Sequence, residues 1–277
     1  MVRILTDTSS DISIETAKQM GIELTKIRIF FGDEEYDADS DPEFTQFYEM
    51  LPNAQTLPTT SQANPEDFIP LFESARDAKD SMVVLLLSSG LSGTVQSAAI
   101  AKQAVKYDEI YIIDSHQTVT GLRLLVDEAI KMRSNGATAK EISERIEAIK
   151  DKVKLYAIVD TLEYLYKGGR MTKASKIAGN LLNFKPIITM AHSLSLIGKE
   201  RGTASAIKFV VDKVDVDKVD LRVPVYFGYS SRSDLCEQLK AEMAKKYPFP
   251  DVITCRVGGV VGTHVGPNAC EITYLEK

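Results

Sequence analysis

Short apolar runs rich in β-branched residues alternate along the chain with longer stretches of helical period. Val2–Leu5, Ile110–Ile113 and Leu155–Val159 are typical of strands, whereas Ile12–Met20 and Thr118–Arg133 have the period of helices. This alternation predicts βα units arranged on a mostly parallel sheet.

The strongest single signals lie in the first half of the chain. Met82–Leu87 is apolar without interruption, as expected of a strand that is covered on both faces. Asn64 is followed by Pro65 and two acids, which predicts a helix start. Thr138 and Glu141 have the spacing of a capping box and predict another. A helix over about Gly93–Tyr107 is also expected.

The pattern of apolar, glycine and basic residues changes after about residue 152. We therefore predict an α/β fold with two domains: a mostly parallel open sheet with flanking helices over residues 1–152, and a second α/β domain over residues 153–277. A basic helix is expected near Thr172–Leu182, and a further helix over Ser233–Lys246. The strands predicted in this half are Ile187–Met190, Leu194–Ile197, Val223–Phe227, Ile253–Val257 and Ile272–Leu275.

Hydroxyl-rich turns follow three of the predicted strands. They are Thr6–Asp11, Ser88–Thr94 and Asp114-Ser115. The carboxyl ends of parallel strands meet at one crevice, where ligands bind, and helix N-termini add free N–H groups. One such turn would be explained by helix capping alone, but three at one edge favour a carboxylate or phosphate site.

Two other segments differ from their surroundings. Pro58–Gln62 has the composition of a loop. Gly258, Gly259, Gly262 and Gly266 surround His264, and glycine at this density predicts special backbone angles or the close approach of a ligand or another chain. His116 and His192 have no such setting and are interpreted as structural or surface residues.

Composition narrows the classes of function. The net charge of −6 argues against a nucleic-acid partner, which would need a basic excess. No apolar run approaches a membrane span, and the N-terminus lacks the pattern of a signal peptide. Three cysteines without metal-ligand spacing suit a reducing cytosol. A cytoplasmic protein without integral membrane association is therefore expected.

Several catalytic signatures are missing from the sequence. Gly90–Gly93 falls short of a nucleophile elbow, and neither a Walker A loop nor a dinucleotide fingerprint occurs. Metal-ligand clusters are also missing, so no metal site is predicted. The segment Lys167–Lys176 is a basic patch that fits either a solvated face or a docking surface for an anionic partner.

Taken together, these segments resemble the DegV family, whose members include the fatty-acid-binding subunit of bacterial fatty acid kinase. The matching pieces occur in family order and cover essentially the whole chain: Thr6–Asp11, Thr60-Ser61-Gln62, Leu87–Thr94 with Gln96-Ser97-Ala98, Thr161–Arg170, Lys185-Pro186-Ile187 and Gly262–Pro267. The chain departs from the family pattern with Ala63-Asn64 after Gln62 and with Asn268 in place of a glycine. Asn tolerates left-handed backbone angles, so Asn268 is expected to be compatible with the turn.

The resemblance implies a long-chain fatty acid of the palmitate, stearate or oleate type, enclosed between the two domains, and no other cofactor. It implies a carboxylate site made of Thr60, Ser61, Ser92 and His264. It also implies an ATP-dependent fatty acid kinase as partner, for which Arg170 and Lys173 are the expected docking residues. In that complex His264 and Arg201, with Lys199 as the alternative, would assist phosphoryl transfer; none of these is expected to be catalytic alone.

Two other functions remain open at the level of sequence. One is a stand-alone phosphotransferase or hydrolase that uses His264 and Ser92. The other is a regulatory protein that senses a lipid without chemistry. The missing nucleotide loop favours a carrier that presents a fatty acid to a kinase.

Overall fold

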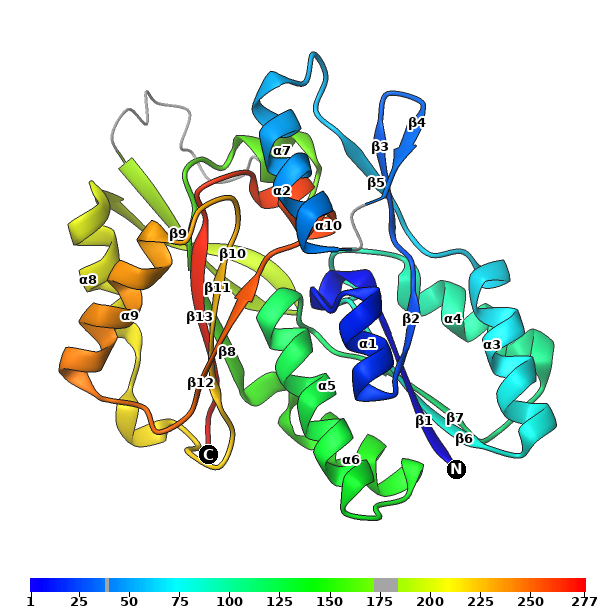
Figure 1. Ribbon diagram of the computed structural model, residues 1–277. Coiled ribbons are helices and arrows are strands. Elements are labelled where there is room, and N and C mark those ends of the chain that lie inside the picture. Colours follow the sequence, from blue (N-terminus) through cyan, green and yellow to red (C-terminus); the bar gives the residue numbers. More distant parts are fainter. Residues whose placement is uncertain (38–39, 172–183) are drawn as a thin grey trace.

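The computed structural model describes residues 1–37, 40–171 and 184–277. Within these ranges, a four-stranded and a six-stranded sheet lie on either side of a shared layer of helices (Figure 1). A three-stranded sheet and several short helices pack across one end of this stack. The predicted α/β class is confirmed, with a parallel sheet in the N-terminal half and further strands and helices in the C-terminal half.

The N-terminal sheet surrounds the predicted buried strand. Its elements are β1 (Val2–Asp7), η1 (Thr8–Ser10), α1 (Ile14–Met20), β2 (Glu23–Thr25), α3 (Pro65–Ala78), β6 (Ser81–Leu86), α4 (Thr94–Val105), β7 (Ile110–Asp114), α5 (Val119–Ser134), α6 (Ala139–Ile149) and η3 (Lys150–Lys152). The strand order is β2-β1-β6-β7, and all neighbours are parallel. In β6, Met82 and Val84 pack toward α3 and α4, whereas Val83 and Leu85 pack toward α5 and α6.

Both predicted helix starts form as expected. Asn64 begins α3 with a reciprocal capping box, in which its N–H donates to Asp67 over 2.7 Å. At the start of α6, the Glu141 N–H donates to the Thr138 hydroxyl and the Thr138 N–H donates to Glu141. These bonds satisfy backbone donors that the first helical turn leaves without partners.

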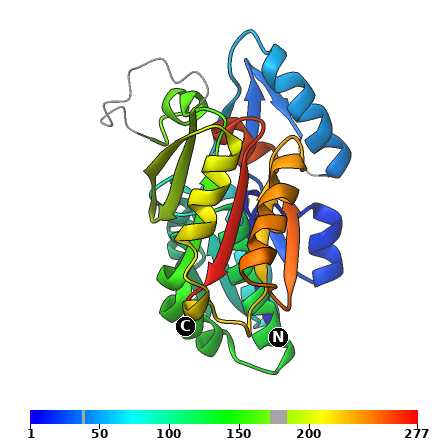
Figure 2. The same cartoon turned by 90° about the vertical axis from the view of Figure 1, so that its left-hand side faces the viewer.

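The C-terminal sheet has the order β10-β9-β8-β13-β11-β12, with antiparallel neighbours except for β11 and β12. Helices α8 and α9 cover its outer face (Figure 2). Its elements are β8 (Val153–Ile158), β9 (Phe184–Ala191), β10 (Ser193–Arg201), α8 (Thr203–Lys213), η4 (Val216–Lys218), β11 (Val225–Tyr229), α9 (Asp234–Lys246), β12 (Val252–Arg256) and β13 (Cys270–Leu275). Helix α8 is not among the helices predicted from the sequence, and the basic helix predicted near Thr172–Leu182 lies outside the described residues.

A third sheet contains a strand that the sequence analysis placed in a loop. Its order is β4-β3-β5, with β3 (Arg28–Phe31), β4 (Glu34–Tyr36) and β5 (Thr59–Ser61), and β5 pairs antiparallel with β3. The loop interpretation of Pro58–Gln62 is therefore wrong for its centre. Around this sheet lie α2 (Asp41–Met50), η2 (Leu51–Asn53), α7 (Glu163–Lys167) and α10 (Gly259–Val265).

Helices α5 and α6 bury apolar side chains against both large sheets. Val83 and Ile113 of the first sheet share a core with Leu125 and Ile146 of the helices and with Leu275 of the second sheet. The second large sheet begins with β8, directly after η3, and the boundary at residue 152 stays a proposal because the two halves share this core. Within the described ranges, the helices are too short or too polar to cross a membrane.

A buried carboxyl group links α5 to the C-terminal sheet. Glu271 of β13 accepts a 2.5 Å hydrogen bond from the Thr120 hydroxyl, and Thr120 also lies 2.7 Å from the Thr273 hydroxyl. Burial raises the pKa of Glu271 to about 7, although the bonds from Thr120 favour the charged form. This glutamate therefore holds its proton at pH values at which the unfolded chain releases it.

We predict that the stability of the protein falls as the pH rises from about 4.5 to 7, and that Glu271→Gln removes part of this fall. A folded-state pKa above the ordinary value means that the stabilisation is complete below the unfolded pKa and is lost as the pH rises through the folded pKa. The rise of the Glu271 pKa from 4.5 to about 7 corresponds to about 3 kcal/mol of folding free energy. Denaturant unfolding across this pH range measures it.

The exposed Glu144→Gln variant serves as the control and should keep the wild-type pH dependence. A Glu271→Gln variant with the same slope as wild type contradicts the assignment.

Candidate functional site

A cavity lies between the two large sheets, below α10 and beside the first turn of α5. The empty space between its lining residues is about 810 Å³, which includes the part open to solvent. Strands β8 and β9, α10 and the turn after β6 supply most of its apolar wall, including Leu87, Leu91, Val119, Leu155, Val159, Leu165, Ile188, Leu194, Val257, Val260, Val261 and Val265.

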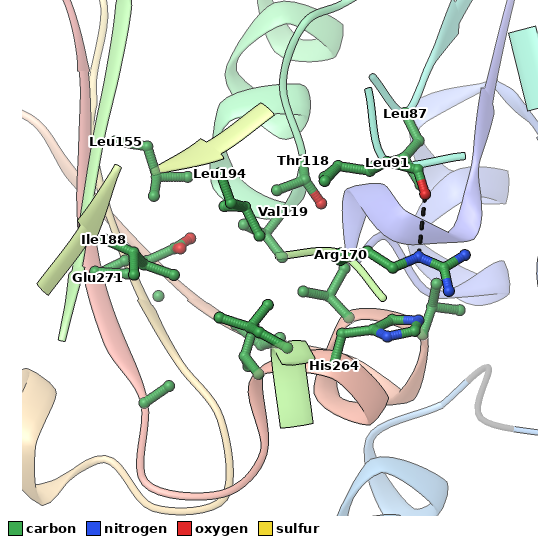
Figure 3. A pocket seen from close by; sticks show the side chains of 18 of the residues that line it. Leu87, Leu91, Thr118, Val119, Leu155, Arg170, Ile188, Leu194, His264 and Glu271 are labelled. Carbon is green, nitrogen blue, oxygen red and sulfur yellow. Dashed lines mark hydrogen bonds between the residues drawn. The ribbon is translucent and has the colours of Figure 1, made fainter. Parts of the chain in front are cut away.

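Polar side chains gather at one end of this cavity. They come from four separate parts of the chain and are Thr60, Gln62, Ser92, Arg170 and His264. Figure 3 shows Arg170 and His264 beside Leu87 and Leu91, with Leu155 and Ile188 toward the opposite end. We call this group the polar end of the cavity.

Arg170 carries the positive charge of the polar end. Its Nε donates to the Leu91 carbonyl over 3.1 Å, and its Nη1 donates to the Gly168 carbonyl over 2.7 Å (Figure 3). No carboxylate within residues 1–37, 40–171 and 184–277 pairs with it, and burial lowers its pKa. A guanidinium has five N–H donors, so donors remain for an anion.

His264 is held as a neutral ring. Its Nε2 lies 2.8 Å from the Thr60 hydroxyl, and burial, with a smaller effect from Arg170, lowers its pKa to about 3. Its Nδ1 is buried without a partner among the described residues. When Nε2 carries the proton and donates to Thr60 Oγ1, the Thr60 hydroxyl proton is free to donate to an anion.

The glycine-rich segment positions His264 by forming a helix. Gly259–Val265 is α10, and a Cβ on Gly262 would lie 2.6 Å from Tyr48 Oη and 2.9 Å from Phe47. Glycine here allows α10 to pack closely on α2. The close approach predicted from these glycines is therefore between α10 and α2 of the same chain. Gly266 ends the helix at φ 76°, and Asn268 takes φ 57°, the left-handed angle expected of it.

Ser92 and Thr60 line the cavity, whereas Ser61 does not belong to its wall. Ser61 neighbours Thr60 on β5, and successive side chains of a strand point to opposite faces. The Ser92 hydroxyl lies 2.9 Å from that of Thr94, just before α4. The structure therefore brings Thr60, Ser92 and His264 to one end of the cavity and leaves Ser61 on the other face of the strand.

The hydroxyls of the first predicted turn serve the fold. Asp7, at the end of β1, accepts bonds from Ser9 and from the Leu87 N–H, the latter over 2.7 Å. Ser10 donates to the Asp7 carbonyl. This turn lies at the predicted edge of the parallel sheet, but Asp7, Ser9 and Ser10 are buried and bind one another.

The remaining predicted residues lie elsewhere or outside the described ranges. Arg201 ends β10, is exposed and does not line the cavity, and Lys199 of the same strand lies over the Phe184 ring. Lys173 lies outside the described residues. Arg170 lines the cavity and is partly exposed.

Two polar residues of the cavity wall are not identified as ligand-facing by the sequence. Gln62 lies at the polar end, where its amide donates to Ser97 over 3.0 Å. Glu271 lies at the opposite end, beside Ile188 (Figure 3). The sequence feature that could have indicated Glu271 is its position as a single acidic residue inside the largely apolar strand Cys270–Leu275.

We predict that the His264 ring in the ligand-free protein does not titrate near pH 6.5, the ordinary value for histidine. Burial and the Arg170 charge both disfavour the imidazolium, which lowers the His264 pKa to about 3. The chain has three histidines, so NMR of the ring protons resolves them, and His264→Gln identifies the relevant signals. In Arg170→Gln the midpoint should rise.

A wild-type His264 midpoint above pH 6 contradicts this description of the polar end.

Sequence comparison gives one family for the whole chain. The family model described as an uncharacterised protein of the DegV family matches residues 1–277. A DegV domain-containing protein of Caldanaerobacter subterraneus is 31% identical over 278 residues, with 100% of this chain and 99% of that protein covered.

Structural comparison agrees over the same length. The structure of a DegV family protein from Thermus thermophilus, described by its fatty acid binding, has a TM-score of 0.90 at 25% identity and covers 100% of this chain and 99% of that one. The structure of DegV from Bacillus subtilis, described as a fatty acid binding protein, has a TM-score of 0.83 at 28% identity, with 100% and 99% covered. With its fold, its ordered motifs and the family model all in agreement from end to end, this chain belongs to the DegV family.

Proposed function

We propose that the protein binds one long-chain fatty acid, with the carboxylate at the polar end of the cavity and the acyl chain along its apolar wall. The observation that carries this proposal is the half-buried guanidinium of Arg170, which has no carboxylate partner among the described residues, at the polar end of a largely apolar cavity. Two structural relatives described as fatty acid binding support the same ligand class.

Charge sets the orientation of the ligand. Arg170 and the hydroxyls of Thr60 and Ser92 replace the hydration of a carboxylate, whereas an unpaired anion would be expensive to bury. Glu271 occupies the opposite end of the cavity. A ligand carboxylate placed there would meet the negative charge of Glu271 or compete with it for a proton. The methyl end of the chain therefore belongs beside Leu155 and Ile188.

Burial of the acyl chain supplies most of the binding free energy. A chain of about 14–18 carbons contributes roughly 0.8 kcal/mol per CH₂, or about 11–14 kcal/mol before the costs of binding. Palmitate, stearate and oleate are of this size, and no other cofactor belongs to the proposal. The fatty acid should therefore stay bound through purification.

The arrangement does not support a hydrolase that pairs Ser92 with His264. Ser92 is bonded to Thr94 and His264 to Thr60, and these two side chains form no mutual hydrogen bond within the described part of the chain. A serine nucleophile needs a base within hydrogen-bond reach. We therefore favour a carrier without catalysis of its own over the stand-alone enzyme, and a lipid-sensing regulator remains the second candidate.

We further propose that an ATP-dependent kinase phosphorylates the bound carboxylate. His264 and Arg201, with Lys199 as the alternative, would stabilise the charge that develops on the transferred phosphoryl group. Arg201 is exposed at the end of β10 and is therefore accessible to a partner. Because Arg170 faces the cavity, we assign it to the carboxylate and leave Lys173 as the docking candidate.

We also propose a cytoplasmic location and a protein without nucleic-acid or integral membrane association. Cys236, Cys255 and Cys270 are free thiols in the structure, which suits a reducing compartment. The net charge of −6 disfavours a polyanionic partner.

Purified protein should carry about one fatty acid per chain. The test is quantitative mass spectrometry of organic extracts of the denatured protein, followed by reloading of the delipidated protein with palmitate or oleate. Lipid that is absent from the extract and not taken up on reloading contradicts the proposed function.

Arg170→Gln should weaken the affinity for palmitate by about 10–150-fold, the range for losing hydrogen bonds to a charged group. Arg201→Gln removes the same charge outside the cavity and should bind palmitate like wild type. Titration of the delipidated variants with a fluorescent fatty acid, displaced by palmitate, measures both.

With a cognate kinase and ATP, loaded Arg201→Gln should form acyl phosphate more slowly than wild type. Equal palmitate affinity in wild type and Arg170→Gln would show that the head group lies elsewhere. An unchanged kinase rate for Arg201→Gln removes Arg201 from the proposal and leaves fatty acid binding untouched.

A further inference from the structure

Two histidines that lie 76 residues apart in the sequence meet beside Asp114, outside the cavity. His116 follows β7, and His192 forms the turn between β9 and β10. Their rings are 4.8 Å apart, and the candidate donor atoms of Asp114, His116 and His192 all lie within 4.8 Å of one another. The sequence predicts no metal site, because nothing in the spacing of these residues indicates that they meet.

We propose that Asp114, His116 and His192 form a binding site for a divalent transition-metal ion of the zinc class. Two imidazoles and one carboxylate are the protein ligands of many zinc centres, with water in the fourth position. Asp114 Oδ2 lies 3.8 Å from His116 Nε2 and 3.9 Å from His192 Nε2. An ion about 2.1 Å from each atom needs them roughly 3.4 Å apart, so each of these two nitrogens must approach Oδ2 by about half an ångström.

The surroundings already orient two of the three ligands. His116 Nδ1 donates to Asp151 over 2.7 Å, which leaves the Nε2 lone pair facing Asp114. Asp114 Oδ1 accepts the backbone N–H groups of Ser89 and His116, over 3.0 and 3.2 Å. Both backbone bonds go to Oδ1, so the partner of Oδ2 among the described residues is the Ser89 hydroxyl.

The Ser89 hydroxyl occupies the place that the ion would take. It donates to Asp114 Oδ2 and lies 3.0 Å from His192 Nε2. Metal binding replaces these two contacts, while the Ser89 N–H still holds Oδ1. The exposed fractions of the Asp114, His116 and His192 side chains are 21%, 25% and 51%, so an ion can reach them from solvent.

A bound ion would fasten the two large sheets together at the cavity wall. His192 lies two residues from Leu194, and His116 lies two residues from Thr118, and both neighbours line the cavity. An ion that binds only the folded chain stabilises it according to its affinity and concentration. The site therefore predicts a zinc-dependent rise in the unfolding temperature.

The test is calorimetric titration of untagged, chelator-treated protein with zinc chloride. Wild type should bind one Zn²⁺ per chain. His116→Asn and His192→Asn should each lose at least about tenfold in affinity, and Asp151→Asn about 10–100-fold, the range for a residue that orients a ligand. Asn is chosen because both histidines have left-handed φ angles, 55° and 65°, which Asn tolerates.

Asp212→Asn is the matched control, since it removes an exposed carboxylate on α8 that is not one of the three ligands, and it should bind Zn²⁺ like wild type. Zinc should raise the unfolding temperature of wild type and of this control but not that of the two His→Asn variants. Mg²⁺, which prefers oxygen ligands, should not bind. No saturable Zn²⁺ binding, equal binding by wild type and His192→Asn, or equal binding of Mg²⁺ and Zn²⁺ overturns the proposal.

Discussion

Partial burial of Arg170, with no carboxylate partner among the described residues, costs free energy that an anionic ligand would recover. Within the described part of the chain, its hydrogen-bond partners are two backbone carbonyls, and apolar side chains surround the rest of the cavity. The same charge helps to keep His264 neutral, so the polar end has one fixed cation and several neutral donors. Such a site fits the ligand that we propose, a monoanion with a neutral hydrocarbon chain in the apolar part.

The fold places this cation where one domain meets the other. Arg170 follows α7, His264 lies on α10, Thr60 belongs to the small sheet, and Ser92 precedes α4. Their meeting depends on close packing at Gly168 and Gly262: a Cβ at Gly168 would lie 2.3 Å from His264 Nδ1, and one at Gly262 would collide with Tyr48. The polar end is therefore a product of tertiary packing between segments up to 204 residues apart.

The sequence predicts the features that depend on local pattern. The apolar run of β6 and the capping residues of α3 and α6 act within a few residues, and the structure confirms them. The glycine density around His264 predicts special backbone angles or a close approach but not the helix α10, because glycine is a poor helix former in isolation. The position of Arg170 inside the cavity, the pairing of His116 with His192 and the depth of Glu271 depend on distant contacts that no local pattern encodes.

A crystal structure of the protein loaded with a fatty acid that carries bromine on its terminal carbon tests the orientation of the ligand most directly. The account predicts anomalous scattering from bromine beside Leu155 and Ile188, and carboxylate density within hydrogen-bond distance of Arg170 and Thr60. Bromine located at the Arg170 end, or a fatty acid bound outside this cavity, would contradict the account.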